Sequence, residues 1–113
     1  MSDRLATELR VGALLRRVND AGGIAMVLAK GDRHDGAILI LTYEKSRFSG
    51  ILEPVAPIDG AARLERVGPD LSCDSTQVAD YWQRRRHADP DLWVIELDIA
   101  SAERFAAETV LVS

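Results

Sequence analysis

Apolar residues recur at helical spacing near the start of the chain. The four that define this stripe occupy positions i, i+3, i+4 and i+7: Val11, Leu14, Leu15 and Val18. The spacing predicts an amphipathic helix with Arg16 and Arg17 on its polar side. Ser2 or Asp3 is placed to cap this helix, and Gly22-Gly23 ends it. Residues 9–11 also fit a short strand, and the sequence leaves both interpretations open.

A second helix is predicted from Val78 to His87. Asp74 followed three residues later by Gln77 approximates a capping box, which marks the start of a helix. The run Arg84-Arg85-Arg86 falls in its last turn, where the helix dipole favours cations. Asp89-Pro90-Asp91 ends the helix, because a proline disfavours the helical conformation of the residue before it.

Segments 24–29 and 37–43 are continuously apolar, which is typical of strands covered on both faces. The polar residues 31–36 between them are bracketed by glycine and predict a hairpin loop. Covering both faces requires a helix on each side. We therefore expect the two predicted helices to lie on opposite faces of a central sheet.

Further strands are expected at 48–53 and at 62–67, the latter near a sheet edge because apolar and charged residues alternate there. After Pro90, alternation predicts a strand with Trp93, Ile95, Leu97 and Ile99 on one face and Leu92, Val94, Glu96 and Asp98 on the other. A short helical turn at 101–107 and a final strand at 109–112 complete the chain.

The resulting fold class is α+β in three layers. Its mainly antiparallel central sheet of about five strands carries helices on both faces, in the order α-β-β-β(-β)-α-β-(α)-β. A length of 113 residues is that of one domain, 1–113.

Composition narrows the class of protein further. The net charge of −4 makes tight, nonspecific nucleic-acid binding unlikely, because such binding depends on clustered basic residues. The single cysteine, Cys73, forms no internal disulfide, which fits a reducing compartment. The N-terminus lacks the apolar stretch of a secretory signal, and no apolar run approaches the ~20 residues that span a bilayer. We expect a cytoplasmic protein with no membrane association.

Three motifs carry a resemblance to a known family. They are Gly31-Asp32-x-x-x-Gly36, Tyr81-Trp82-x-Arg84-Arg85 and Asp89-Pro90-Asp91-x-Trp93-Val94-x-Glu96. With them, nearly the whole chain resembles a bacterial family of small, roughly 110-residue proteins known only as a domain of unknown function. The resemblance implies a single-domain bacterial protein, and it implies no activity, cofactor or functional residue.

One candidate site is a divalent-metal site of carboxylates. The oxygen ligands such an ion prefers are offered by two groups, Asp32 and Asp35 with His34 in one loop, and Glu96 and Asp98 on one strand face. In this hypothesis a metal-assisted hydrolase uses the four carboxylates, with His34 as a further ligand or general base. The alternative is structural: solvated loop residues, and carboxylates paired with arginines of the neighbouring helix.

The second candidate site combines tryptophan and arginine. Trp82, Trp93 and Arg84-Arg85-Arg86 suit a protein interface, since tryptophan and arginine are common interface anchors, or an anion or nucleotide site. The alternative is a core tryptophan and a solvated helix end.

The chain offers no nucleophile paired with a base and no phosphate-binding glycine loop before a helix. We therefore favour a non-enzymatic binding module without a cofactor, acting as a homo-oligomer or with a protein partner. The Trp82/Arg85/Trp93 region is its expected contact surface.

Overall fold

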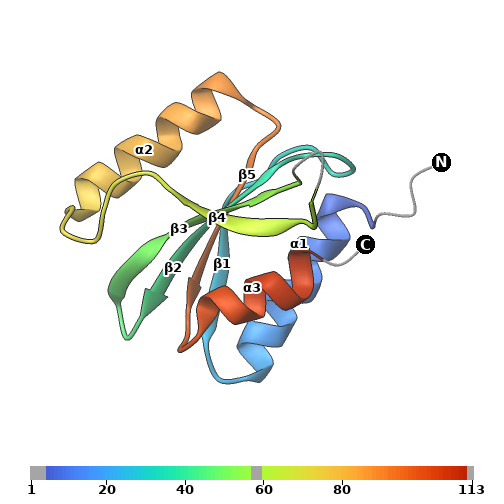
Figure 1. Cartoon of the computed structure of the whole chain (residues 1–113), viewed down its shortest axis with the longest axis horizontal. Helices are drawn as coiled ribbons and strands as arrows, with labels where there is room; N and C mark the ends of the chain where they lie inside the picture. Colours follow the sequence, from blue (N-terminus) through green and yellow to red (C-terminus); the bar gives the residue numbers. More distant parts are fainter. Residues whose placement is uncertain (1–4, 57–59, 112–113) are drawn as a thin grey trace.

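Figure 1 shows the computed structural model of the chain, which describes residues 5–56 and 60–111. Its helices are α1 (Thr7–Asp20), α2 (Ser75–Ala88) and α3 (Ala102–Val110). Its strands are β1 (Ile24–Ala29), β2 (Ile38–Glu44), β3 (Arg47–Val55), β4 (Arg63–Val67) and β5 (Trp93–Asp98).

The five strands form one sheet in the order β1-β5-β2-β3-β4. All neighbours are antiparallel except β2 and β5, which run parallel. The expected α+β class with a mainly antiparallel sheet is confirmed. The predicted hairpin at residues 31–36 is wrong, because β5 lies between β1 and β2. The loop instead carries the chain across the start of β5.

The helices divide between the two faces of the sheet, as the sequence predicts: α1 and α3 lie on one side and α2 on the other (Figure 1). Each side has its own apolar core. The core under α1 and α3 contains Val11, Leu14, Val18, Ile38, Ile40, Leu52, Trp93, Ile95, Leu97 and Val110. The core under α2 contains Leu39, Leu41, Ile51, Val78, Leu92 and Val94. The predicted alternation of β5 between the two faces is therefore confirmed.

Strands β1 and β2 look alike in sequence and differ in burial. Residues 38–42 of β2 are buried, as expected for a strand covered on both faces. Strand β1 pairs with β5 and forms one edge of the sheet, with Ile24 and Met26 exposed. The expectation that both faces of β1 are covered is therefore wrong. Strand β4 forms the other edge, in agreement with its alternating pattern.

Helix α1 settles the alternatives for residues 9–11, which are helical. The helix begins at Thr7 with Ala6 as N-cap and without a side-chain cap. Ser2 and Asp3, the predicted capping residues, lie outside the described residues. The helix ends at Asp20, and Gly22 adopts the positive φ of 92° that favours glycine.

The predicted final strand is also wrong. Thr109 and Val110 belong to α3, and Val112 lies outside the described residues. Packing against α1 favours the helix, because the Arg17 guanidinium donates to Thr109 Oγ1 (2.7 Å) and Glu108 Oε1 (2.9 Å). The buried Arg10 adds a second link, donating from Nη1 to the Val110 carbonyl at 2.7 Å.

Helix α2 begins as predicted. Asp74 is its N-cap, and both hydrogen bonds of the capping box with Gln77 are present. Within the described ranges, no helix is long and apolar enough to cross a membrane.

Candidate functional site

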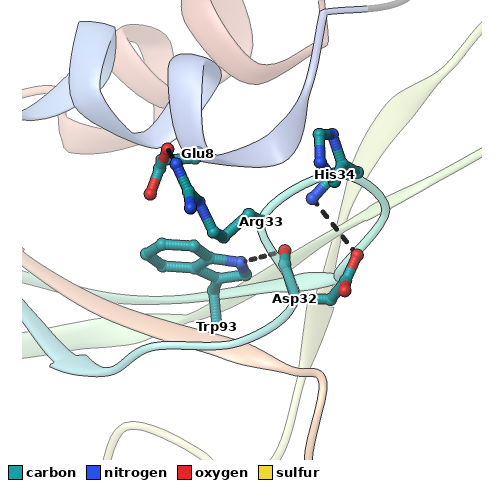
Figure 2. Close-up of polar contacts among 5 residues, drawn as sticks. All are labelled: Glu8, Asp32, Arg33, His34 and Trp93. Carbon is teal, nitrogen blue, oxygen red and sulfur yellow. Dashed lines mark hydrogen bonds and ion pairs between the residues drawn. The ribbon is translucent and has the colours of Figure 1, made fainter.

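The two tryptophans lie on opposite faces of the sheet. Trp93 is only 3% exposed and packs in the core under α1 and α3, whereas Trp82 is half-buried against the core under α2. The Trp93 indole Nε1 donates to the Asp32 carbonyl at 2.7 Å (Figure 2). The structure therefore does not bring Trp82 and Trp93 together on one contact surface.

The loop of residues 31–36 packs tightly against the turn that precedes β5. Asp32 N donates to the Asp91 carbonyl at 2.9 Å. A Cβ added to Gly31 would lie 2.0 Å from that carbonyl oxygen, and one added to Gly36 would lie 2.4 Å from it. Only glycine fits at either position without backbone movement. These contacts join the first and third motifs of the family resemblance into one structural junction.

The same loop caps α1. Thr7 N and Glu8 N donate to the carbonyls of His34 (3.0 Å) and Arg33 (2.9 Å), which serves the N–H groups that a helix start leaves unpaired. Thr7 Oγ1 donates to the Gly36 carbonyl at 2.8 Å. Figure 2 shows Arg33 reaching Glu8, with a 3.2 Å ion pair between their side chains. The loop is thus fixed by α1 on one side and by β5 on the other.

The carboxylate of Asp32 is occupied within its own loop. Its Oδ2 accepts hydrogen bonds from the backbone N–H groups of Asp35 (2.7 Å) and His34 (3.2 Å). The Asp35 bond, with that of His34 and the nearby His34 charge, lowers the pKa of Asp32 below its ordinary value. This geometry stabilises the turn and keeps the carboxylate ionised.

The carboxylates proposed for a metal lie at opposite ends of β5. Asp32 and Asp35 lie beside its first residue, whereas Glu96 and Asp98 lie toward its last, which is about 16 Å further along the strand. Asp98 accepts from the backbone N–H groups of Lys45 (2.8 Å) and Ser46 (2.9 Å). Within residues 5–56 and 60–111, no three His, Cys, Asp or Glu side chains are grouped to hold a metal ion.

Glu96 differs from the other carboxylates in its surroundings. Partial burial on the α2 side of the sheet, together with the neighbouring Asp98 charge, raises its pKa. The expected pairing of Glu96 and Asp98 with the arginines of α2 is not among the ion pairs of the described residues.

The three consecutive arginines of α2 have different partners. Arg85 donates to Glu53 Oε2 at 2.5 Å and to the Tyr81 hydroxyl at 2.8 Å, and its pKa is raised mainly by the Glu53 bond. Arg86 donates from Nη1 to the Pro90 carbonyl. Arg84 has one long bond, from Nε to the Asp80 carbonyl at 3.4 Å. Arg85 thus holds α2 against β3, while the two Nη groups of Arg84 make no hydrogen bond within the described part of the chain.

A groove of about 920 Å³ runs along α2 beside the segment that follows β4. Tyr81 and Gly68 both line it and lie close together. A Cβ added to Gly68, whose φ is +79°, would lie 3.1 Å from the Tyr81 ring. Arg84 and His87 also line the groove. Of the residues predicted for an anion site, Arg84 is therefore the one that faces an open space.

The feature that the sequence analysis missed is the free edge of β1. Ile24 is 62% exposed and Met26 is 44% exposed, although both lie in an uninterrupted apolar segment. The continuous hydrophobicity that predicts cover on both faces of this strand also fits an apolar edge strand. Nothing in the local pattern separates the two, because the difference depends on where β5 inserts.

The chain is a small α+β protein with a mixed sheet and one apolar core on each face. Loop 31–36 is fixed against the turn before β5. The chain belongs to the family described as "Protein of unknown function (DUF1491)", whose sequence model matches residues 5–107. The expected membership in a bacterial family of unknown function is confirmed. Among proteins of curated function, none matches the chain.

Three solved structures have the same fold. The crystal structure of a DUF1491 family protein from Caulobacter crescentus CB15 is 26% identical, with a TM-score of 0.78 over 89% of this chain and 94% of that chain. The NMR structure of a DUF1491 family protein from the same organism is 28% identical, with a TM-score of 0.75 over 92% and 94%. The solution structure of protein Atu0922 from A. tumefaciens is 26% identical, with a TM-score of 0.69 over 96% and 92%.

Proposed function

We propose that this protein is a small binding module that self-associates by pairing the β1 edges of two copies. The contrast between the two edges of the sheet carries the proposal. Strand β4, Arg63-Leu64-Glu65-Arg66-Val67, is short and charged, which discourages further strand pairing. Strand β1, Ile24-Ala25-Met26-Val27-Leu28-Ala29, has no charged residue. An apolar edge without such protection is a template for pairing with another strand.

The geometry of β1 indicates which part of the edge would pair. The register against β5 shifts between Val27 and Ala29, and this irregularity confines the regular edge to Ile24–Val27. Ile24 and Met26 project from the face of the sheet that α2 occupies. On that face, their cross-strand partners in β5 are Asp98 and Glu96, respectively. Pairing would bury both apolar side chains and satisfy the backbone groups of the edge.

The edge of β1 is suited to pair with the same edge of a second copy of this chain. In a two-fold symmetric pair the same strand serves both partners, so an edge strand is self-complementary in its hydrogen bonding. Lys30 directly follows the last residue of β1, and Asp20 lies shortly before its first. In an antiparallel pair the last residues of one β1 approach the first residues of the other, so the positive Lys30 of one copy lies near the negative Asp20 of its partner. A strand from a different protein would use the same edge, and the experiment below distinguishes it from self-association.

The experiment measures molar mass by light scattering during size-exclusion chromatography over a series of protein concentrations. The chain has a mass of 12.4 kDa, and we expect the wild type to approach twice this mass as the concentration rises. Met26→Lys should remain monomeric, because two charged side chains would meet on the paired edges. The control is Leu71→Lys, which changes a residue of similar exposure (58%) away from β1 and should still dimerise.

A wild type that stays at 12.4 kDa at every concentration would rule out self-association. A dimer that Met26→Lys and Leu71→Lys weaken equally would rule out the β1 edge as its contact.

A further inference from the structure

We propose that the groove beside α2 binds a small molecule that combines one anionic group with a planar polar ring, of the kind found in a nucleoside monophosphate. The groove volume of about 920 Å³ falls within the range of small-molecule sites. This site is separate from the β1 edge, so the inference does not depend on the proposed function.

The anionic group is assigned to Arg84 and His87. These residues are three apart on α2 and both line the groove, so they project from the same side of the helix. The Arg84 Nε bond to the Asp80 carbonyl orients the guanidinium, and its two Nη groups remain to donate to a phosphate or carboxylate. Arg85 and Arg86 have protein partners instead, Glu53 and the Pro90 carbonyl respectively.

The ring is assigned to the Tyr81 end of the groove. Arg85 donates to the Tyr81 hydroxyl, and its guanidinium carbon lies 5.7 Å from the ring centroid, so the aromatic ring is held in place before any ligand arrives. Gly68 lies against the edge of this ring, and a side chain there would occupy the space beside it. A planar ligand can contact the Tyr81 ring without displacing protein atoms.

Polar groups along the groove select the rest of the ligand. The Gln77 side-chain amide can donate from its NH₂ group, because its Oε1 already accepts from Asp74 N in the capping box. The Asp80 carboxylate accepts from a hydroxyl or amine. Asp80 also repels a second anionic group, which disfavours polyanions such as nucleic acid. The set therefore fits a ligand with one anionic group and several hydrogen-bond donors.

Most side chains of helix α2 are not needed for packing in the core, so the helix can carry these polar residues. Val78 is the one buried side chain among its fourteen residues. The exposed side chains of Arg84 and His87 can therefore be replaced without opening the core, which makes the proposal testable by substitution.

The test is a ¹H–¹⁵N NMR titration with adenosine monophosphate, with inorganic phosphate and adenosine as partial probes. We expect saturable shifts from adenosine monophosphate at residues 68–69 and 77–87, with weaker binding of both partial probes at the same residues. Arg84→Gln should weaken adenosine monophosphate binding about tenfold, the loss expected for a charge-assisted hydrogen bond. The control Arg16→Gln removes an exposed arginine from α1 and should bind like the wild type.

Dispersed spectra of both variants would show that each is folded. The proposal is overturned by shifts that do not saturate, by shifts centred elsewhere, or by equal weakening in Arg84→Gln and Arg16→Gln. Met26→Lys should bind adenosine monophosphate as well as the wild type does, which separates this result from the fate of the β1 edge.

Discussion

Two glycines of the loop between β1 and β2 lie so close to Asp91 that their lack of a side chain is a structural requirement. The contacts of Gly31 and Gly36 with the Asp91 carbonyl, and the bond from Trp93 to the Asp32 carbonyl, connect residues about sixty positions apart. Packing therefore explains the first and third of the motifs that carry the family resemblance. Their spacing alone could not show this, because the contact forms only when β5 enters the sheet.

Gly31→Ala should destabilise the fold by about 3 kcal/mol, since a Cβ 2.0 Å from the Asp91 oxygen forces backbone atoms apart. The free energy of unfolding in urea measures the effect. Gly12→Ala is the matched control, because a Cβ there meets no atom within 4 Å and alanine favours the helix by about 1 kcal/mol. Equal effects of the two changes would contradict the role of the junction.

Glu96 should oppose folding at neutral pH. Partial burial and the Asp98 charge raise its pKa in the folded state, so the folded protein holds this proton more tightly than the unfolded chain does. The stability that this proton contributes is complete below the ordinary glutamate pKa of 4.5 and is lost as the pH rises through the raised pKa of Glu96. We expect Glu96→Gln to be more stable than the wild type at pH 7, with the difference in unfolding free energy shrinking toward pH 4. A constant difference across this range would exclude titration of Glu96 as its cause.

At the scale of elements, α2 is attached more loosely than α1. One side chain of α2 is buried, compared with five of α1, and the Arg85 bonds to Glu53 and Tyr81 add a polar attachment. Its local stability depends correspondingly on the capping box. Asp74→Ala should cost about 1 kcal/mol and speed amide hydrogen exchange in residues 75–88 more than in α1. Thr76→Ala, a change in the same first turn that leaves the cap intact, should have little effect.

The turn between β2 and β3 places two ordinary residues in a left-handed conformation. Lys45 has φ 52° and Ser46 has φ 66°, the pattern of a two-residue hairpin turn that favours Asn-Gly. Replacing Lys45-Ser46 with Asn-Gly should stabilise the protein by about 1 kcal/mol, because left-handed backbone is costly for most side chains. The Asp98 bonds use backbone N–H groups and are kept. Urea unfolding measures the gain, and an unchanged midpoint would show that these bonds already offset the strain.

The elements themselves were largely predictable, because each depends on a local signal. The capping box at Asp74 located α2, and the alternation along β5 assigned its two faces correctly. The exception is the end of the chain, where the sequence analysis expects a strand at 109–112 and α3 extends to Val110. Thr109 instead lies in α3, where its hydroxyl donates to the Phe105 carbonyl of the same helix and accepts from Arg17. The Arg17 contact exists only when α3 packs on α1.

At the scale of the whole molecule, the order of strands determines which surfaces are open, and local patterns do not encode it. Strand β5 pairs with residues of β1 and β2 that precede their partners by more than fifty positions, and this insertion leaves the apolar strand β1 at an edge of the sheet. Trp82 and Trp93 lie apart because Trp93 faces the side of the sheet opposite α2. Asp32 and Asp98 lie apart because they flank opposite ends of β5. The sequence does not show either separation, because each depends on how loop 31–36 and helix α2 pack against β5.

If β1 edges pair, the stability of the molecule should depend on its concentration. Dimerisation stabilises the folded state by mass action, because the unfolded chain has no ordered edge to pair. We expect the unfolding midpoint of the wild type to rise by about 2–4 °C for each tenfold increase in concentration, given the entropy of unfolding of a domain this size. Leu71→Lys should show the same slope, and Met26→Lys should show none. Since Met26 is 44% exposed in the monomer, its replacement removes little core packing, so Met26→Lys should match the wild type at low concentration and fall behind it only as the wild type dimerises.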